Sequence, residues 1–565
     1  MPFQLSPGVS VVEKDFTSIV PAVSSSAGAF AGTFQWGPIN DPVTITSENE
    51  LVSRFGKPNS TQTVYTSFFT AANFLSYANN LLVVRADGSS YKNAVFSGTA
   101  IKVKNADDYT TNYISGSASV GPFAAKWAGA IGNSLKVSLC DSTNFTGWAY
   151  EDEFDSAPGT SDYASTRGAS DDEIHVIVID EDGLFTGTPN AILEKYAYVS
   201  KASDAKKADG TNNYYKDAIN SNSRYLWWMD HPTNEADGDN EWGDAAASGA
   251  YHTLGAAVTA SLAGGVDDLA PSDGNLQTAY SIFDNAEVYD ISLIMMGKAS
   301  STNATYVINN VAETRLDCVV FVSPENNSTA EIITDGTSTP ADDLVTYRNA
   351  LPSSSYAVID SGYKYQYDRY NDAYRYVPLN GDVAGLCART DYQTDPWFSP
   401  AGYNRGQVKN VVKLAFTPNK TARDTLYKAG INPVVTFPGQ GTVLFGDKTA
   451  LSKPSAFDRI NVRRLFIVLE KSIATAAKYQ LFEFNDSFTR AQFKNLVEPF
   501  LRDVQGRRGI TDFRVVCDGT NNTGEVIDRN EFACDIFIKP NRSINFINLS
   551  FIAARSSVSF DEIGG

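Results

Sequence analysis

The chain has 565 residues, of which 42% are hydrophobic and 12% aromatic, so it is long enough for several hydrophobic cores and too apolar for a disordered protein. Its net charge of −19 argues against a nucleic-acid-binding protein, because contact with phosphates requires an excess of Lys and Arg. No apolar run approaches the ~18 residues that cross a bilayer, and the N-terminus lacks the pattern of a secretion signal, so we expect synthesis and residence in a cytoplasm without membrane insertion.

The N-terminal segment, residues 1–22, predicts an extended arm with no core of its own. Val9, Val11 and Val12 follow a Pro-Gly pair and show no helical period. We expect this arm to join the C-terminal domain.

Residues 23–96 predict a small α/β unit. A short apolar strand lies in AFAGTFQWGP, and a helix is expected to begin at Ser47, which forms a capping box with Glu50, and to end at Gly56. The string TVYTSFFTAANFLSYANN has apolar residues at helical spacing, and LLVVRA follows it as a buried strand.

Residues 97–262 change in character and predict an inserted, β-rich, acidic outer domain. Short strands such as SLKVSL and EIHVIVID lie among long polar runs. Residues 151–250 contain 21 acidic and 7 basic residues, whereas residues 401–565 contain 16 acidic and 23 basic ones. Either an acidic outer face opposes a basic functional face, or the insertion is a solvated segment that keeps the protein soluble.

The α/β alternation resumes in residues 263–398 with the strands ISLIMMG and CVVFVSP, so we expect these residues to complete one discontinuous middle domain with 23–96. Residues 399–565 predict a C-terminal domain with two long helices, two strands and a terminal strand arm, in which Ile547, Leu549 and Phe551 share one face. The predicted fold class is therefore a multidomain α+β or α/β protein with extended arms at both ends.

Two strings resemble cofactor-binding or metal-binding motifs, but each lacks residues that the motif requires. The string GTVLFGDKT approaches a phosphate loop, but Asp447 separates Gly446 from Lys448, which must follow that Gly directly. The string DGDNEWGD has the alternating carboxylates of a calcium loop, but its turn Gly is one position late and Ser248 replaces the bidentate Glu. We therefore expect no cofactor and no enzymatic activity.

The histidines and cysteines form no recognisable catalytic or metal-binding motif in the sequence. His175, His231 and His252 lie in no metalloprotease or hydrolase motif. The five cysteines are an odd number and no two are close in sequence, so reduced, buried thiols are expected rather than disulfides or a thiolate metal site.

Several long strings resemble the contractile tail sheath proteins of myoviruses, most closely those of the T-even type. They include SPGVSVVEKD, AFAGTFQWGPINDPVTITSENELVSRFGKP, WAGAIGNSLKVSL, YAVIDSGYKYQYDRYNDAYRYVPLNGDVAGLCARTDYQTDPWFSPAGYNRGQV and ACDIFIKPNRSINFINLSFIAAR. The resemblance covers most of the chain outside residues 141–260.

This resemblance implies a structural subunit of a bacteriophage virion, assembled in the host cytoplasm. It implies hexameric rings stacked as a helical polymer around a tail tube, with the C-terminal domain innermost and the insertion outermost, and with baseplate and tail terminator proteins as further partners. Contraction by rigid-body rearrangement would drive the tube through the host envelope. The arms would add strands to the sheets of neighbouring subunits through the following predicted contact residues: Val9, Val11, Val12, Ile547, Leu549 and Phe551.

The basic C-terminal third suggests a surface that grips an acidic tube. The candidates are Arg463, Arg464, Lys471 and Lys478. The equally weighted alternative is that these side chains only solvate or cap the helix that carries them.

Two competing functions stay open at this stage. One is the sheath of a phage-tail-like bacteriocin or extracellular injection system, although its usually smaller insertions fit this chain length less well. The other is a metal-dependent hydrolase acting on receptor glycans, with its site in the acidic insertion; bound metal and a cleft of converging carboxylates would distinguish it.

Overall fold

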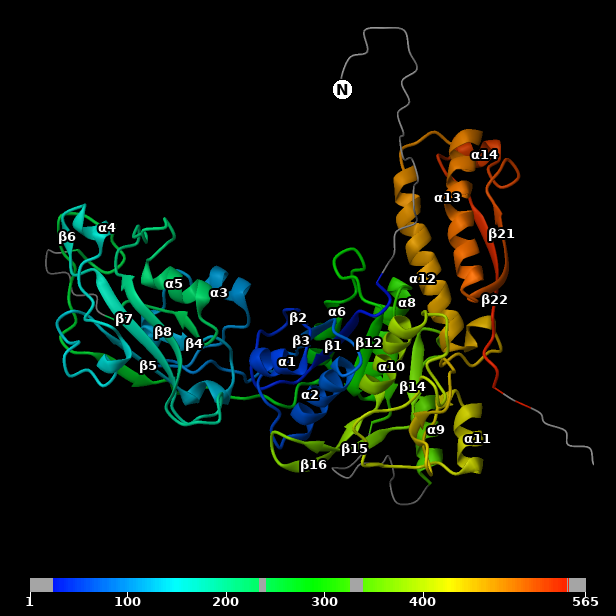
Figure 1. Cartoon of the computed structure of the whole chain (residues 1–565), viewed down its shortest axis with the longest axis horizontal. Coiled ribbons are helices and arrows are strands. Elements are labelled where there is room, and N and C mark those ends of the chain that lie inside the picture. Colours follow the sequence, from blue (N-terminus) through cyan, green and yellow to red (C-terminus); the bar gives the residue numbers. More distant parts are fainter. Residues whose placement is uncertain (1–23, 233–239, 326–338, 546, 548–565) are drawn as a thin grey trace, which may run out of the picture. The chain divides into compact units, whose positions relative to one another are not determined.

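The computed structural model describes residues 24–232, 240–325, 339–545 and 547. The chain folds into two compact units. The larger unit contains Val23–Pro396 and Pro400–Val468, and the C-terminal unit contains Trp397–Ser399 and the chain from Leu469 onwards. Both units mix helices and strands, as the sequence predicts (Figure 1).

A seven-stranded sheet forms the centre of the larger unit, with the strand order β18-β14-β13-β12-β1-β3-β2. All neighbours are parallel except β2, which runs antiparallel to β3. Every residue of β1 and β13 is buried, as expected for a parallel sheet covered on both faces. The strands are β1 (Gly28–Gly32), β2 (Val43–Ile45), β3 (Leu81–Arg85), β12 (Leu293–Lys298), β13 (Val319–Ser323), β14 (Ala357–Asp360) and β18 (Ile431–Asn432).

Helices cover this sheet, and their ends follow local sequence signals. Ser47 caps the first helix by accepting a hydrogen bond from the Glu50 amide, and Gly56 ends it with a positive φ of 82°, so the predicted boundaries are confirmed. Helices α2 and α10 pack on each other and on β12, while α6 packs on β1. The helices are α1 (Glu48–Phe55), α2 (Gln62–Leu75), α6 (Asp273–Ser281), α7 (Ser301–Val307), α8 (Glu313–Arg315), α9 (Pro340–Asn349), α10 (Asn380–Gln393) and α11 (Lys420–Lys428).

Two small antiparallel sheets complete the part of the larger unit around the central sheet. β15 pairs with both of its neighbours in a three-stranded sheet, and β19 forms a hairpin with β20. The strands are β15 (Tyr363–Asp368), β16 (Ala373–Pro378), β17 (Lys413–Leu414), β19 (Val434–Phe437) and β20 (Gly441–Leu444).

The insertion leaves and re-enters the α/β unit through adjacent segments. Lys92 pairs with Val266 and Val95 with Ala263 in isolated antiparallel bridges. Its main sheet has the order β11-β5-β7-β8, and a separate core surrounds Trp228. The elements are α3 (Ala106–Asn112), β4 (Phe123–Ala125), β5 (Leu135–Cys140), α4 (Asp162–Ser165), β6 (Ala169–Ser170), β7 (Glu173–Asp180), β8 (Ala191–Ser200), α5 (Tyr215–Asn222), β9 (Leu226–Trp228), β10 (Gly249–Ala250) and β11 (Val258–Ser261).

The C-terminal unit is a helical pair with a two-stranded sheet. Helix α12 (Ile460–Ala477) begins in the larger unit and continues into this one, and α13 (Ser487–Gly506) packs on β21. β21 (Ile510–Val516) and β22 (Asp535–Pro540) pair in antiparallel fashion, and α14 (Gly524–Asp528) lies in their connection.

The observed division differs from the predicted domain boundary at residue 399. β18 adds to the edge of the central sheet beside β14, and residues 400–468, including the first half of α12, belong to the larger unit. The strand that joins this segment to the central sheet has only two residues, Ile431 and Asn432, and a separate hairpin follows it. Such a short strand gives no clear pattern in the sequence.

Candidate assembly surface

The sheet of the C-terminal unit has unpaired edges. Within the described residues, β21 and β22 pair only with each other, so each strand keeps one edge of backbone donors and acceptors free of a strand partner. Such an edge is a template for a strand from another chain. Side chains alternate along β22: Phe537 is 59% exposed, whereas its neighbours Ile536 and Ile538 are half-buried.

An apolar surface occupies the connection between α12 and α13. Leu481, Phe482 and Phe484 are 63%, 105% and 84% exposed, and Tyr479 and Phe488 flank them with similar exposure. We call these five residues the apolar loop. A cluster of large, solvent-exposed apolar side chains is typical of a protein–protein contact surface. The sequence predicts two long helices in this part of the chain and does not indicate an exposed apolar surface between them.

Two of the predicted tube-facing residues are buried inside the larger unit, which corrects that prediction. Arg464 is 3% exposed and forms a bidentate ion pair with Asp391, with N–O distances of 2.6 and 2.8 Å. Arg463 is 5% exposed, and its guanidinium lies 3.9 Å from the ring centroid of Phe457 and donates to the Tyr356 hydroxyl. Contacts inside the larger unit therefore hold both side chains away from solvent.

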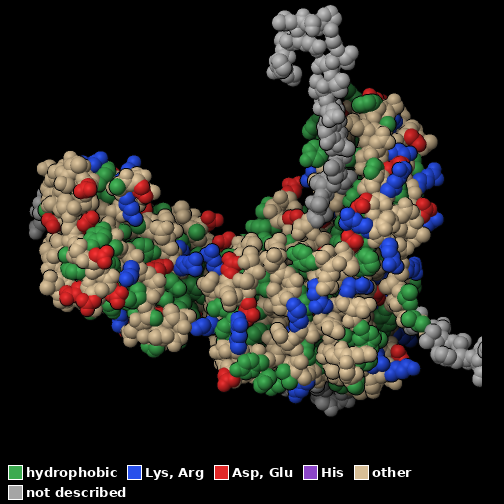
Figure 2. All heavy atoms as spheres, viewed as in Figure 1, with side chains coloured by type: hydrophobic (Ala, Val, Ile, Leu, Met, Phe, Trp, Pro, Cys, Tyr) green, Lys and Arg blue, Asp and Glu red, His purple; other side chains and the backbone are tan. Residues whose placement is uncertain are grey.

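The other two basic candidates lie in the C-terminal unit. Lys471 is half-buried on α12, and Lys478 is exposed just after the end of that helix, next to the apolar loop. Figure 2 shows many acidic side chains on the insertion and Lys and Arg side chains on the C-terminal unit, as the sequence counts predict.

The predicted arm residues fall mostly outside the described residues. This applies to Val9, Val11, Val12, Leu549 and Phe551. Ile547 is described; it is 76% exposed and is not part of a strand in this single chain.

The near-miss phosphate loop has a structural role. Asp447 forms an ion pair with Arg459 at 3.0 Å, and Lys448 donates to the backbone oxygen of Tyr427. His175 is equally structural, since its ring stacks on Phe154 and burial lowers its pKa.

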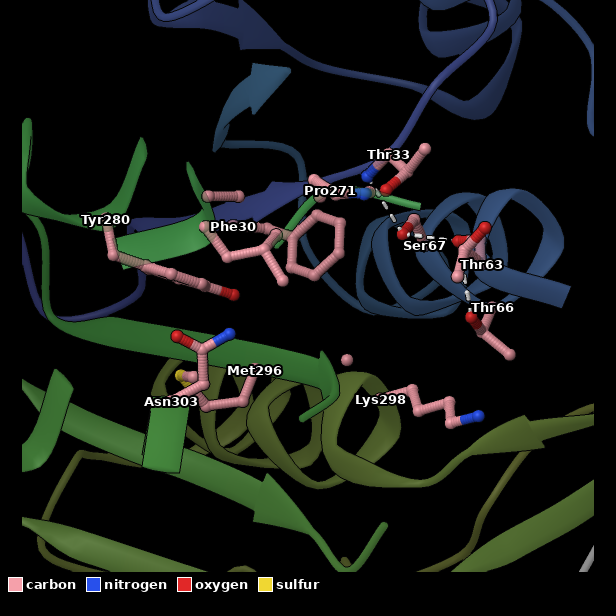
Figure 3. Close-up of a pocket in the computed structure, with 14 residues that line it drawn as sticks. Phe30, Thr33, Thr63, Thr66, Ser67, Pro271, Tyr280, Met296, Lys298 and Asn303 are labelled. Carbon is pink, nitrogen blue, oxygen red and sulfur yellow. Dashed lines mark hydrogen bonds between the residues drawn. The ribbon is translucent and has the colours of Figure 1, made fainter. Parts of the chain in front are cut away.

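A small cavity lies at the carboxyl ends of β1 and β12, where the strand order reverses (Figure 3). This is where ligands bind in many open α/β sheets. Ser67 accepts from the Thr33 amide and donates to the Thr63 carbonyl, and Lys298 donates to Gln62 at 2.9 Å. The cavity volume of about 70 Å³ has room for a few water molecules, not for a nucleotide.

Buried charges near this edge of the sheet connect it to α10. Asp360 accepts from Ser323 at 2.7 Å, and burial raises its pKa to about 8. Lys364 forms a fully buried ion pair with Asp382 at 2.9 Å, and the Tyr77 hydroxyl also contacts that carboxylate. In the described part of the chain, no group of three or more His, Cys, Asp or Glu side chains is arranged to hold a metal ion.

None of the described helices is both long and apolar enough to cross a bilayer.

Comparison with known proteins assigns a family to this architecture. The family model for the phage tail sheath protein central domain matches residues 276–450, and that for the phage tail sheath C-terminal domain matches residues 452–553. The model for the domain III N-terminal region of tail sheath protein Gp18 matches residues 29–86. The boundary between the first two models lies well beyond residue 399, in agreement with the observed fold.

Proteins similar to this chain over its full length are also tail sheath proteins. The chain is 36% identical, over an alignment of 681 positions including gaps, to the tail sheath protein of Vibrio phage KVP40, covering 99% of this chain and 100% of that protein. It is 33% identical to the tail sheath protein of Enterobacteria phage T4, with 99% of each chain covered. These alignments span nearly the whole chain.

Solved structures show the same fold at low identity. A sheath tail protein from Listeria innocua superposes with a TM-score of 0.54 at 12% identity, covering 92% of this chain and 96% of that one. The contracted helical sheath of the anti-feeding prophage gives a TM-score of 0.51 at 12% identity, covering 97% and 99%.

The fold and the full-length similarity define a structural sheath protein. The chain belongs to the phage tail sheath protein family and is a subunit of a contractile tail sheath.

Proposed function

We propose that this chain polymerises as six-fold helical rings around the tail tube of a bacteriophage and that neighbouring copies are joined by their terminal arms. The single observation that supports this most is the two-stranded sheet β21–β22, whose outer edges have no strand partner among the described residues. An arm from another copy adds to such an edge through main-chain hydrogen bonds, while alternate side chains set the register.

The proposed arms have the composition that this role requires. Val9 and Val11 would lie on one face of an added strand, and Leu549 and Phe551 would do the same in the C-terminal arm. Val12 and Ile547 would lie at the ends of these contacts. Because the link would be made by the terminal segments and not by the faces of the folded units, each subunit could rotate as a rigid body during contraction while the polymer stays connected.

The apolar loop offers the additional contact that drives contraction. In the extended sheath its aromatic side chains would be partly hydrated, and closer packing of subunits would bury them. Apolar burial contributes roughly 25 cal/mol per Å², so loss of this exposed surface in every subunit releases free energy without a nucleotide.

The inner surface would meet the tail tube through Lys478 and, at the side of α12, Lys471. Each exposed ion pair contributes only about 0–1 kcal/mol, so many weak contacts hold the tube and still release it. Baseplate and terminator proteins would bind the ends of the polymer, and assembly would take place in the host cytoplasm before the particle is complete.

The arm model is tested by charge substitutions in the N-terminal arm. The double variant Val9→Asp with Val11→Asp is expected to remain folded, because the sequence predicts an arm without a core of its own, and to form no tubular polymers in negative-stain electron microscopy. Ser10→Asp, on the opposite face of the same strand, is the matched control and is expected to polymerise. Tubes of normal length from the double variant would refute the arm contact.

The tube contact is tested separately. Lys478→Glu is expected to leave self-assembly intact and to reduce sheath assembly on purified tubes, with a stronger effect at low salt because screening weakens surface ion pairs. Unchanged assembly on tubes across salt concentrations would contradict a role of Lys478 at this surface.

A further inference from the structure

Two cysteines that are 17 positions apart in the sequence face each other in the C-terminal unit. The ladder between β21 and β22 ends at the pair Val516 and Asp535. Cys517 follows Val516 and Cys534 precedes Asp535, just beyond the strand ends, so continuation of this register places the two cysteines opposite one another. Each thiol also affects the pKa of the other, as expected for two side chains that lie close together.

Side-chain hydrogen bonds fix the backbone on both sides of this pair. Asn521 donates to the carbonyl of Val516 at 2.7 Å and accepts from the amide of Asp518 at 3.1 Å. On the other strand, Asn522 contacts Ala533 twice, donating to its carbonyl at 2.8 Å and accepting from its amide at 2.9 Å. Both cysteines are therefore held in place by their immediate neighbours.

The Cα–Cα distance expected for these two cysteines allows a disulfide bond. Directly opposite residues of antiparallel strands have Cα atoms about 4.5–5.5 Å apart, which lies inside the range of about 4.4–6.8 Å found for disulfides. Cys517 is 4% exposed and lies on the face that includes Val515, whereas Cys534 is partly exposed and gives access to an oxidant. The other three cysteines, Cys140, Cys318 and Cys387, are buried in the larger unit.

We propose that Cys517 and Cys534 are a redox-active pair that forms an intrachain disulfide across the end of the β21–β22 hairpin when the particle meets an oxidant outside the reducing cytoplasm. Oxidising surroundings are where such bonds persist. The bond closes a loop that contains α14 and ties the two strands together at their connected end. It leaves the outer edges of the sheet unoccupied, so this inference does not depend on the arm contacts proposed above.

The oxidation balances with a diazene such as diamide. One thiolate adds to the N=N bond, and the second thiol then attacks the sulfur of this adduct. The two sulfurs lose two electrons and two protons in total, and the diazene becomes the hydrazine. Burial raises the pKa of Cys534 to about 12 and also raises the pKa of Cys517, so thiolate is scarce at neutral pH and the pair stays reduced without an oxidant.

The experiment treats the folded full-length chain with diamide, removes the reagent, and counts thiols after unfolding in guanidinium chloride without reductant. Wild type is expected to fall from five free thiols to three. Cys534→Ser, with four cysteines, is expected to keep all four as a monomer. Cys318→Ser, the matched control in β-sheet surroundings of the larger unit, is expected to fall from four to two.

Peptide mapping locates the bond. Trypsin cleaves after Arg514 and Arg529, which puts the two cysteines on different peptides. Under non-reducing conditions these peptides are expected to run as one linked species that a reductant separates. Five remaining thiols in oxidised wild type, or a bond between any other two cysteines, would overturn the proposal.

Discussion

Truncation of Arg464 is expected to destabilise the subunit rather than its contact with a tube. The guanidinium makes two hydrogen bonds to Asp391, at 2.6 and 2.8 Å, and further ones to the carbonyls of Cys387 and Ser25 at 3.2 and 3.1 Å. In Arg464→Met the apolar stem is retained but Asp391 loses its cation. Within the described residues, it then keeps the hydroxyl of Ser25 as its side-chain donor, at 2.7 Å.

The size of the expected destabilisation follows from the burial of the ion pair between Arg464 and Asp391. The side chains of this ion pair are 3% and 7% exposed, and removal of one partner from a buried pair costs about 3–5 kcal/mol because the remaining charge is unpaired in a poorly solvated place. We therefore expect the free energy of unfolding to fall by about 3–5 kcal/mol in Arg464→Met. Urea titration monitored by tryptophan fluorescence measures this change.

Two further variants separate charge from packing. Asp391→Asn combined with Arg464→Met is expected to recover at least half of the loss, because no unpaired carboxylate remains. Lys478→Met, at an exposed site, is expected to change stability by no more than about 0.5 kcal/mol. A stability of Arg464→Met equal to wild type, with impaired assembly on tubes, would refute the structural role and restore the tube-facing assignment.

Two other predictions concern pH and the apolar loop. Because burial raises the pKa of Asp360 to about 8, the folded chain keeps a proton that the unfolded chain loses near pH 4, so stability is expected to fall as pH rises from about 4 to about 8 and to level off above. Asp360→Asn should flatten this slope in urea titrations at several pH values, and an unchanged slope would show that Asp360 is ionised in the folded state. Phe482→Ser combined with Phe484→Ser is expected to leave the stability of the isolated subunit within about 0.5 kcal/mol, since both rings are exposed, and to raise the critical concentration for polymerisation at least tenfold. An unchanged critical concentration in sedimentation assays would exclude these rings from the subunit contacts.

Local sequence signals determined many individual elements. The capping box of Ser47 and the glycine at position 56 fix the ends of α1, because capping hydrogen bonds and a positive φ depend on residues within one turn. The alternation of buried strands with helices predicts an α/β fold, and long specific strings indicate the sheath family. The polar, acidic composition of residues 97–262 predicts an insertion.

Only the tertiary structure decided which side chains lie at surfaces and which distant segments meet. The charge of Arg463 and Arg464 suggests an exposed basic face, yet packing against Tyr356, Phe457 and Asp391 buries both. The cysteines of the hairpin are far apart in sequence and become neighbours only through the register of β21 and β22.

The residues themselves thus determined local conformation and family membership, since both depend on short-range patterns. The domain boundary, the buried ion pairs, the apolar loop and the cysteine pair were decided by packing, because burial and register depend on contacts between segments that no local pattern encodes.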